Sequence, residues 1–276
     1  MTVIEDSAKI CLGGVGLSFD GVHALDKVDL VLRPRQSLVL IGGSGSGKSL
    51  LLKCILGLIE PDTGSIVVDG KETVGMSGKE RMLWMRRFGV LFQRQGLFDS
   101  LSVWENVAFR ILHERNMSRV DARETAIEKL KLVGLTENTA DLSPAALSGG
   151  MQKRVGLARS IASDPDILFL DEPTAGLDPI MSNVIGDLVN DRVNDLGATV
   201  ISIVSDLAVV RRIAQRVVML HEGRVVWQGS VSDLDTTAND YVRQFVTQTI
   251  EGPIQMPGLK HRKSNIERKF NKNNFV

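Results

Sequence analysis

The stretch Gly42–Ser49 reads Gly-Gly-Ser-Gly-Ser-Gly-Lys-Ser, and these residue types suit the binding of a phosphate group. Glycines let the backbone fold around an anion and point N–H groups at it. The Lys48 ammonium can reach the outer phosphates of a nucleotide, and the Ser49 hydroxyl can coordinate Mg²⁺. The spacing therefore predicts a loop that binds nucleotide phosphates.

The segments on either side of this loop are those that it needs for support. Residues 37–41 are an apolar run typical of a buried strand, and residues 50–56 are typical of a helix. A helix that begins directly after the loop adds a partial positive charge beside the anion. A flexible Gly/Ser turn would not require this order of strand, loop and helix.

A pair of carboxylates ends a second apolar segment. Residues 167–170 are hydrophobic, and Asp171 and Glu172 follow them. The carboxyl ends of parallel strands meet at one edge of a sheet, so we expect both acids beside the phosphate loop. Asp171 can then hold the Mg²⁺ shell and Glu172 can polarise an attacking water. The alternative is a strand that simply ends in solvated charge.

Three further positions have both a functional and a structural interpretation. Phe19 can stack on adenine or can be a core aromatic residue. Gln93 follows the apolar run 88–92, where it can contact a ligand or lie in a surface loop. Ser148, Gly149 and Gly150 precede a predicted helix, whose free N–H groups could form a second phosphate site. Taken separately, these signals are weak.

Composition restricts the function classes. The chain has 276 residues, 43% hydrophobic and 24% charged, and 33 Lys and Arg balance 33 Asp and Glu. No net field draws it to nucleic acid or to an anionic membrane. It has no apolar run that could span a bilayer and no signal peptide in residues 1–6, so we expect a cytoplasmic protein. The basic stretch 260–272 predicts a disordered tail, with docking or lipid contact as the alternative.

The remaining pattern predicts an α/β fold. Strands are expected within 9–32, a β-hairpin whose first strand is 65–68 and whose turn is 69–70, and further strands at 198–204, 216–220 and 224–227. Residues 101–142 are helix-rich and contain no clear strand, which indicates a helical block inserted into the sheet domain. We therefore predict one domain over 1–246 with a helical subdomain at about 97–150, followed by a tail over 247–276.

The motifs, taken in order from about Lys9 to Ser230, resemble those of the ATP-binding cassette (ABC) ATPases. Residues 42–49 are similar to Walker A, Gln93 to the Q-loop, 147–152 to the signature, 166–172 to Walker B and 175–178 to the D-loop. The resemblance implies a P-loop NTPase core with a parallel sheet, an antiparallel β subdomain and an inserted helical subdomain, with ATP and Mg²⁺ as cofactors. It implies nucleotide contacts at Phe19, Gly42, Gly43, Ser44, Gly45, Ser46, Gly47, Lys48, Ser49, Leu50, Ser148, Gly149, Gly150, Gln152 and Asp178. It implies metal contacts at Ser49, Gln93 and Asp171, and catalytic roles for Glu172, Lys48, Gln93 and Ser205.

Several segments are similar to the ATPase of Mla-type phospholipid transporters, which maintain outer-membrane lipid asymmetry. They are residues 95–103, 178–180, 242–245 and 251–253. The resemblance implies a phospholipid cargo, a membrane permease, and MCE-domain and accessory subunits. It also implies a place on the cytoplasmic face of a bacterial inner membrane. The tail is longer and more basic than this subfamily leads us to expect.

The resemblance also implies a head-to-tail homodimer, in which the Ser148–Gly150 segment of one copy caps the ATP bound to the other. The chain departs from the family at Ser205, where a histidine that contacts the γ-phosphate is usual. Losing such a contact lowers the rate on the order of a hundredfold. The alternatives are therefore a slowly hydrolysing, nucleotide-gated clamp or an ABC transporter of another cargo class. A DNA-repair or translation ATPase is disfavoured, because there is no second cassette, and no nucleic-acid partner is expected.

Overall fold

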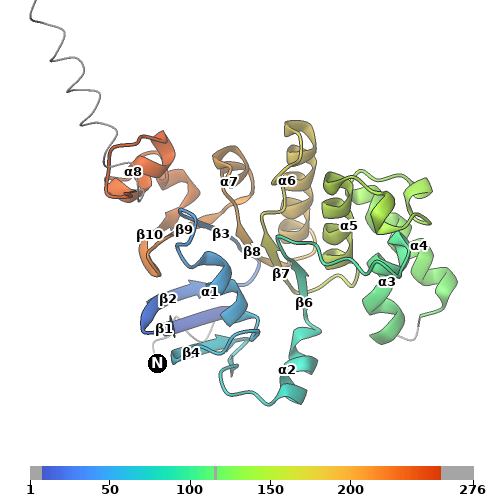
Figure 1. Ribbon diagram of the computed structural model, residues 1–276, viewed down its shortest axis with the longest axis horizontal. Coiled ribbons are helices and arrows are strands. Elements are labelled where there is room, and N and C mark those ends of the chain that lie inside the picture. The colour runs from blue at the N-terminus through green and yellow to red at the C-terminus, as the bar shows by residue number, and fades with distance from the viewer. Residues whose placement is uncertain (1–7, 115–116, 256–276) are drawn as a thin grey trace, which may run out of the picture.

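The computed structural model describes residues 8–114 and 117–255. Two sheets lie at one end of the molecule, and helices α3 (Val103–Glu114), α4 (Arg119–Leu132) and α5 (Gly149–Ile161) lie at the other (Figure 1). The expectations for residues 1–6, and for the basic stretch 260–272, fall outside the described residues.

The smaller sheet has four strands that pair antiparallel in the order β2-β1-β4-β5. Its predicted hairpin is confirmed, because β4 and β5 pair across the turn at 69–70. The strands are β1 (Ile10–Phe19), β2 (Val22–Leu32), β4 (Thr63–Val68) and β5 (Lys71–Glu72).

The larger sheet has six strands in the order β10-β9-β3-β8-β7-β6. All neighbours pair parallel except β9 and β10, which pair antiparallel. The predicted strands of this sheet are confirmed, and β10 runs further than expected. The strands are β3 (Ser37–Ile41), β6 (Phe88–Leu91), β7 (Ile167–Asp171), β8 (Thr199–Ile203), β9 (Arg216–His221) and β10 (Arg224–Ser230).

Alternating side chains of the larger sheet feed two separate hydrophobic clusters. In β3, Leu38 and Leu40 belong to the cluster that includes the β1–β2 sheet and helix α1 (Lys48–Ile55), whereas Val39 and Ile41 belong to the cluster that includes helices α3, α4 and α5. Successive residues of a strand point to opposite faces, so the sheet is buried on both sides. This explains why its strands are nearly continuous apolar runs.

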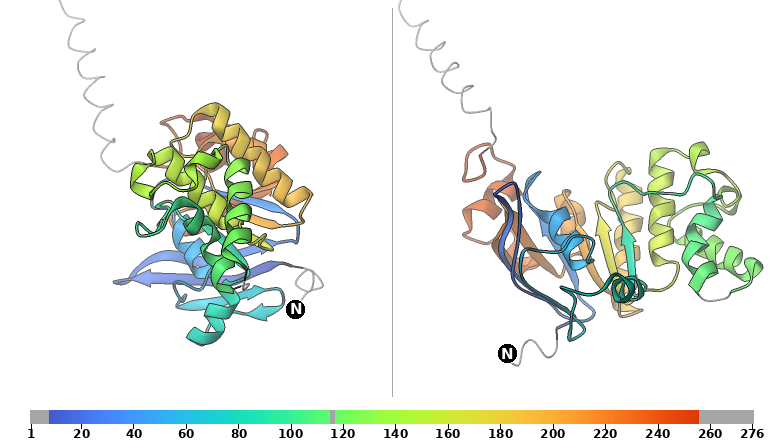
Figure 2. Two further views of the ribbon diagram at one scale, coloured as in Figure 1. Left: turned by 90° about the vertical axis from the view of Figure 1, so that its right-hand side faces the viewer. Right: turned by 60° about the horizontal axis from the view of Figure 1, so that its bottom comes forward.

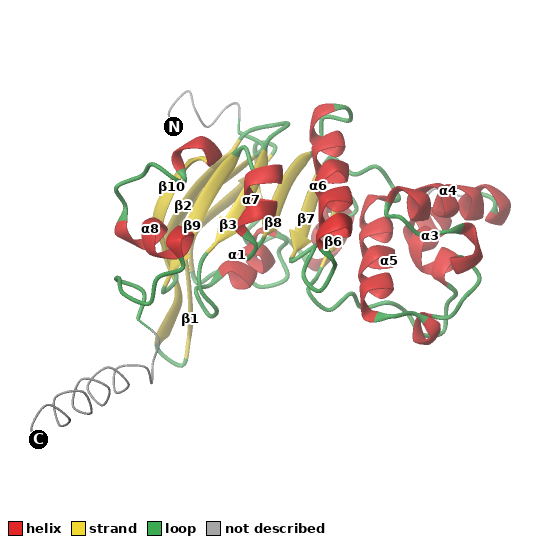
Figure 3. Ribbon diagram, turned by 90° about the horizontal axis from the view of Figure 1, so that it is seen from above, coloured by secondary structure: helices red, strands yellow, loops and turns green. Residues whose placement is uncertain are grey.

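The helices cover this sheet and extend beyond it (Figures 2 and 3). Between residues 97 and 150 the described chain contains no strand, as expected for a helical insertion. No helix of the described ranges is long and apolar enough to cross a membrane. The helices are α1 (Lys48–Ile55), α2 (Gly78–Met85), α3 (Val103–Glu114), α4 (Arg119–Leu132), α5 (Gly149–Ile161), α6 (Pro179–Asn194), α7 (Leu207–Ile213) and α8 (Asp240–Thr247), with short 3₁₀ turns at Glu137–Thr139, Pro144–Ala146 and Val231–Asp233.

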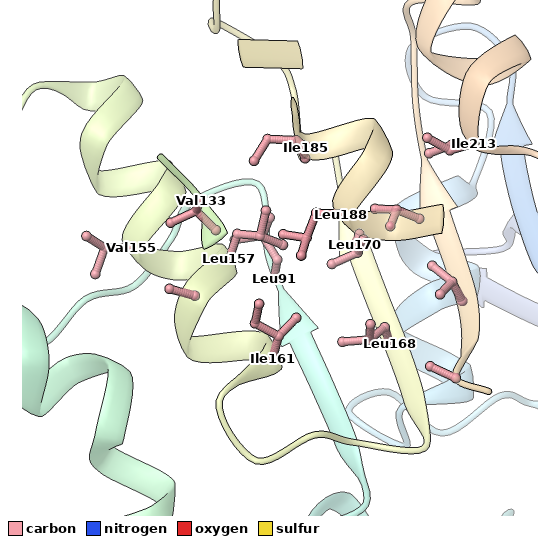
Figure 4. Packing of buried hydrophobic residues seen from close by; sticks show 14 of the residues in the cluster. Leu91, Val133, Val155, Leu157, Ile161, Leu168, Leu170, Ile185, Leu188 and Ile213 are labelled. Atoms are coloured by element: carbon pink, nitrogen blue, oxygen red, sulfur yellow. The ribbon is translucent and has the colours of Figure 1, made fainter. Parts of the chain in front are cut away.

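Helix α5 attaches the helical block to the sheet. Its residues Leu157 and Ile161 pack with Leu91 of β6 and Leu168 of β7 in one buried cluster (Figure 4). All four side chains are at most 1% exposed. Helix α5, which begins within the signature segment 147–152, therefore forms one rigid unit with strands β6 and β7.

The chain turns back on itself after α8. The Gln244 side chain is buried, and its amide nitrogen donates to the carbonyls of Thr249 (3.3 Å), Ile250 (3.4 Å) and Ile254 (3.0 Å). The Ile254 N–H donates to its amide oxygen at 2.7 Å. Residues 248–255, which the sequence assigns to the tail, are thus held against α8.

Candidate functional site

The loop from Gly42 to Gly47 adopts backbone geometry that requires glycine at specific places. Gly42 has a φ of 138°, and a Cβ there would lie 2.2 Å from the carbonyl oxygen of Leu220. Gly47, at the start of α1, has a φ of 101°, and a Cβ there would lie 2.9 Å from the Ala24 carbonyl oxygen of β2. The close approach of β9 and β2 therefore fixes the loop from both sides.

The Lys48 ammonium lies across this loop. It donates hydrogen bonds to the carbonyl oxygens of Gly42 and Gly43, both at 2.7 Å, and to Ser46 Oγ at 3.1 Å. Burial lowers the pKa of this ammonium, and the carboxylates of Glu172 and Asp171 oppose that shift. The loop thus carries a positive charge within reach of both acids.

Ser49 and Asp171 form an oxygen-rich pair at the first turn of α1. Ser49 Oγ donates to Asp171 Oδ2 at 3.3 Å, and Asp171 is only 7% exposed. Burial raises the pKa of the Asp171 carboxyl, the charge of Glu172 adds to that increase, and the hydrogen bond from Ser49 opposes it. The interpretation of this strand as one that ends in solvated charge is therefore wrong for Asp171.

The donor set of this pair fits Mg²⁺. A hydroxyl and one carboxylate are hard oxygen ligands, and Mg²⁺ is commonly bound by one or two carboxylates together with substrate phosphates and water. Within the described ranges no group of three or more His, Cys, Asp or Glu side chains gathers to hold a metal. The pair thus suits a metal that arrives with phosphates.

Glu172 is the first residue after β7, and Ser205 holds its carboxylate. Ser205 Oγ donates to Glu172 Oε1, and the Ser205 N–H points at Oε2 from 3.4 Å. The Glu172 backbone has a φ of 53°, and its N–H donates to the Ile203 carbonyl at 2.9 Å. Strands β7 and β8 are parallel neighbours, so the residues that follow their carboxyl ends meet. None of these three contacts was predicted from the sequence.

Gln93 and Phe19 are accessible at the ends of their strands. Gln93 follows β6 and is exposed, and the loop after it is held by Arg159 of α5, which donates to the Gly96 carbonyl at 2.9 Å. Phe19 ends β1 and is 50% exposed. The interpretation of Phe19 as a core aromatic residue is therefore wrong, and its ring is available for stacking.

The signature segment, residues 147–152, lies at the start of α5. Ser148 caps this helix by accepting the Met151 N–H at 3.3 Å, and Ser148 and Gly149 are exposed. Gln152 donates instead to its own chain, to the Pro144 carbonyl at 3.0 Å and the Leu147 carbonyl at 3.4 Å. Strands β7 and β8 and helix α6 separate α5 from α1 (Figures 1 and 3). One chain therefore does not bring this segment to its own phosphate loop.

The remaining predicted nucleotide contact, Asp178, caps helix α6. Its carboxylate accepts the N–H groups of Ile180 and Met181, both at 3.0 Å. The side chain is exposed beyond these two bonds, so the D-loop that it ends is fixed at one end by α6.

Lys153 is a site residue that the sequence analysis missed. It is 8% exposed, and its ammonium donates to the carbonyl of Glu172 at 3.1 Å and to that of Ala175. It lies on the same face of α5 as Leu157 and Ile161, four and eight residues later. A lysine inside an apolar i, i+4, i+8 row was the signal that could have revealed it.

Comparison with known proteins matches this arrangement. The sequence model of the ABC transporter family matches residues 25–175. The protein TRIGALACTOSYLDIACYLGLYCEROL 3, chloroplastic, of Arabidopsis thaliana is 39% identical over 254 residues, which cover 86% of this chain and 73% of the relative. The methionine import ATP-binding protein MetN of Haemophilus influenzae is 37% identical over 236 residues, or 85% of this chain and 67% of the relative.

A solved structure agrees with both sequence matches. It is the dimeric, post-hydrolysis state of the ATP-binding cassette MJ0796 bound to ADP and Pi, and it superposes with a TM-score of 0.78 at 30% identity. The match covers 80% of this chain and 98% of that one. The predicted α/β P-loop NTPase fold is confirmed. The chain belongs to the ABC transporter family, as an ATP-binding subunit that hydrolyses ATP to drive transport.

Proposed function

We propose that the chain binds ATP with Mg²⁺ at the loop 42–49 and powers phospholipid transport through a membrane permease. The observation that carries the ATP site is the meeting of Lys48, Ser49, Asp171 and Glu172 at one edge of the larger sheet. Loop N–H groups and Lys48 bind the β and γ phosphates, while Phe19 stacks on the adenine. Mg²⁺ bound by Ser49, Asp171 and Gln93 would neutralise charge on the phosphates.

Hydrolysis transfers the γ-phosphoryl group to water. The water oxygen forms a bond to the γ-phosphorus as the bond to the bridging oxygen breaks and ADP leaves. Glu172 aligns that water and accepts the proton that it releases, and Ser205 holds the glutamate carboxylate in place. Lys48 stabilises the charge that develops on the departing phosphate.

The second half of each site comes from a second copy of the chain. ABC ATPase domains dimerise and pair with permease subunits, and the solved relative with ADP and Pi is itself a dimer. Ser148 and Gly149 are exposed and Gly150 is half-buried, and the N–H groups of these three residues suit the γ-phosphate of ATP held by the partner. Asp178 and Gln152 then lie in the segments that support this interface.

The phospholipid cargo rests on the Mla-type segments and on the Arabidopsis relative, whose name is that of a diacylglycerol lipid. It brings with it MCE-domain and accessory subunits and a place on the cytoplasmic face of a bacterial inner membrane. The methionine importer is similar at 37% identity, and it supports another cargo class as the second candidate. The contact of Ser205 with Glu172 favours active hydrolysis over a nucleotide-gated clamp, because it keeps the base in place without a histidine.

The experiment is ATP turnover and labelled phospholipid transfer by the chain with its permease, in vesicles of phosphatidylethanolamine and phosphatidylglycerol. We expect Glu172→Gln to bind ATP normally but to lose at least a hundredfold in turnover, because the amide cannot accept the proton of the water. Ser205→Ala should lose about tenfold, the value of one hydrogen bond to a charged group.

Each part of the proposal fails separately. Equal turnover by the wild type and Glu172→Gln would replace the active enzyme with the nucleotide-gated clamp. Normal ATP turnover without phospholipid transfer, but with transfer of methionine, would leave the ATPase and overturn the cargo.

A further inference from the structure

Lys153 of α5 is a buried lysine whose hydrogen bonds, within the described chain, go to main-chain carbonyls. The two acceptors are the oxygens of Glu172, at 3.1 Å, and Ala175. Burial lowers the pKa of this ammonium, and the carboxylates of Glu172 and Asp171 oppose the shift. The lysine is therefore close to both acids of the candidate ATP site, although the proposed mechanism does not use it.

Packing alone does not require a lysine at position 153. An ammonium loses hydration when it is buried, and only good partners offset that cost. Methionine would fill the same row of α5 with Leu157 and Ile161, and it would need no partner. What the lysine adds is a charge-assisted bond to each end of the turn 172–175.

That turn determines where the Glu172 carboxylate points. The Ala175 N–H closes it on the Glu172 carbonyl at 3.3 Å, and the Glu172 backbone takes the left-handed φ of 53°. The Glu172 N–H is held by Ile203, and its carboxylate by Ser205, both at the β8 side. Lys153 supplies the hold from the opposite side, through the main-chain carbonyl of the same residue.

The helix that carries Lys153 is fixed to the sheet and begins at the signature segment. Leu157 and Ile161 pack into the cluster drawn in Figure 4, and Gly149 lies one helical turn before Lys153. The lysine therefore connects the start of α5 to the turn that bears Glu172.

We propose that Lys153 is a positioning residue for Glu172, which fixes the water-aligning carboxylate relative to the start of α5. This inference rests on the proposed role of Glu172 as the group that aligns water. A misplacement of about 1 Å at a reacting group costs on the order of a hundredfold in rate, so a lost hold on the turn is expected to lower turnover rather than ATP binding.

The test is steady-state ATP turnover of the full complex with Lys153→Met, beside Lys129→Met as the matched control. Lys129 is a comparably buried lysine of α4 that donates to Asp164 Oδ1 at 2.7 Å, away from the turn. We expect Lys153→Met to lower kcat at least tenfold with KM for ATP within twofold, and Lys129→Met to keep both values within twofold. Lys153→Gln retains one amide donor and should give an intermediate kcat.

The lysine variants are also combined with Glu172→Gln, and the single-turnover rate of ATP hydrolysis is measured. If the lysine acts through Glu172, its loss should leave the residual single-turnover rate of Glu172→Gln unchanged within twofold. A kcat for Lys153→Met equal to that of Lys129→Met would overturn the inference, as would an undiminished loss in the Glu172→Gln background. Should Lys153→Met lack cooperative thermal unfolding, Lys153→Gln takes its place in both backgrounds, and a kcat below that of Lys129→Met is then the expected result. Full turnover by Glu172→Gln alone would instead overturn the proposed function on which the inference rests.

Discussion

Two glycine-containing helix starts, those of α1 and α5, look alike in sequence and differ in their surroundings. The start of α1 lies between β9 and β2, with Lys48 over it and Asp171 beside it. The start of α5 is exposed at Ser148 and Gly149, and a side-chain cap from Ser148 is its main local feature. The start of α1 is therefore enclosed by its own chain, whereas the start of α5 lies on the surface of the molecule.

The difference teaches how a single chain can encode a site that it does not complete. A two-fold dimer presents the same two surfaces on each copy, so every exposed α5 start can meet an enclosed α1 start of the other copy. In the proposed dimer, we expect the enclosed half to determine whether ATP binds. We expect the exposed half to determine whether the bound ATP joins two chains.

The largest effect is expected from Gly42→Ala in the enclosed half. The added Cβ would lie 2.2 Å from the Leu220 carbonyl oxygen at a φ of 138°, which we expect to lower the free energy of unfolding by roughly 3 kcal/mol and ATP affinity at least a hundredfold. Gly43→Ala has no atom within 4 Å of its Cβ and serves as the folding control. Titration with a fluorescent ATP analogue and thermal unfolding measure both quantities. Normal ATP affinity of Gly42→Ala would show that the enclosure is not needed.

Gly149→Ala tests the exposed half with a smaller change. Its Cβ would have no neighbour within 4 Å, so the single chain should fold and bind ATP as the wild type does. A methyl group facing the partner's γ-phosphate should still lower turnover by about tenfold. Gly78→Ala, at the first residue of α2 and equally unobstructed, is the matched control. Unchanged turnover with Gly149→Ala would show that the start of α5 does not contribute to the ATP site of the partner.

The smallest effect separates the two roles of Ser148. Ser148→Ala removes the helix cap and should lower the free energy of unfolding by about 1 kcal/mol, and it should also lower turnover about fivefold. Ser118→Ala removes the equivalent cap of α4, whose Oγ accepts the Asp121 N–H at 3.1 Å. We expect the same loss of stability there without a change in turnover. Similar turnover in the two variants would show that Ser148 acts only as a helix cap.

The sequence was sufficient where the determinants are local. A strand, a glycine loop and a helix follow one another within 37–55, and each has its own short-range pattern, so the phosphate loop and its supports could be placed correctly. The apolar runs of β7 and β8 identified buried strands in the same way. The family resemblance implied a parallel sheet, but neither it nor the runs predicted that these two strands are neighbours.

Contacts between distant residues could not be predicted in this way. Ser205 and Glu172 lie 33 residues apart, and their hydrogen bond depends on β7 and β8 ending at the same level of the sheet. The hydrogen bond from Lys153 to the Ala175 carbonyl depends on how α5 packs against the sheet, and no local sequence pattern specifies that packing. The loss of hydrolysis rate expected for Ser205 was based only on the missing contact with the γ-phosphate, because the proximity of Glu172 was not visible in the sequence.

The backbone of Glu172 has a consequence for how this chain can vary. At a φ of 53°, glycine or asparagine would be more stable than glutamate by roughly 1 kcal/mol. Selection for thermal stability alone would favour replacing the residue, whereas selection for ATP turnover would favour keeping it. A homologue with glycine or asparagine at this position would therefore mark a lineage in which selection for turnover had been relaxed.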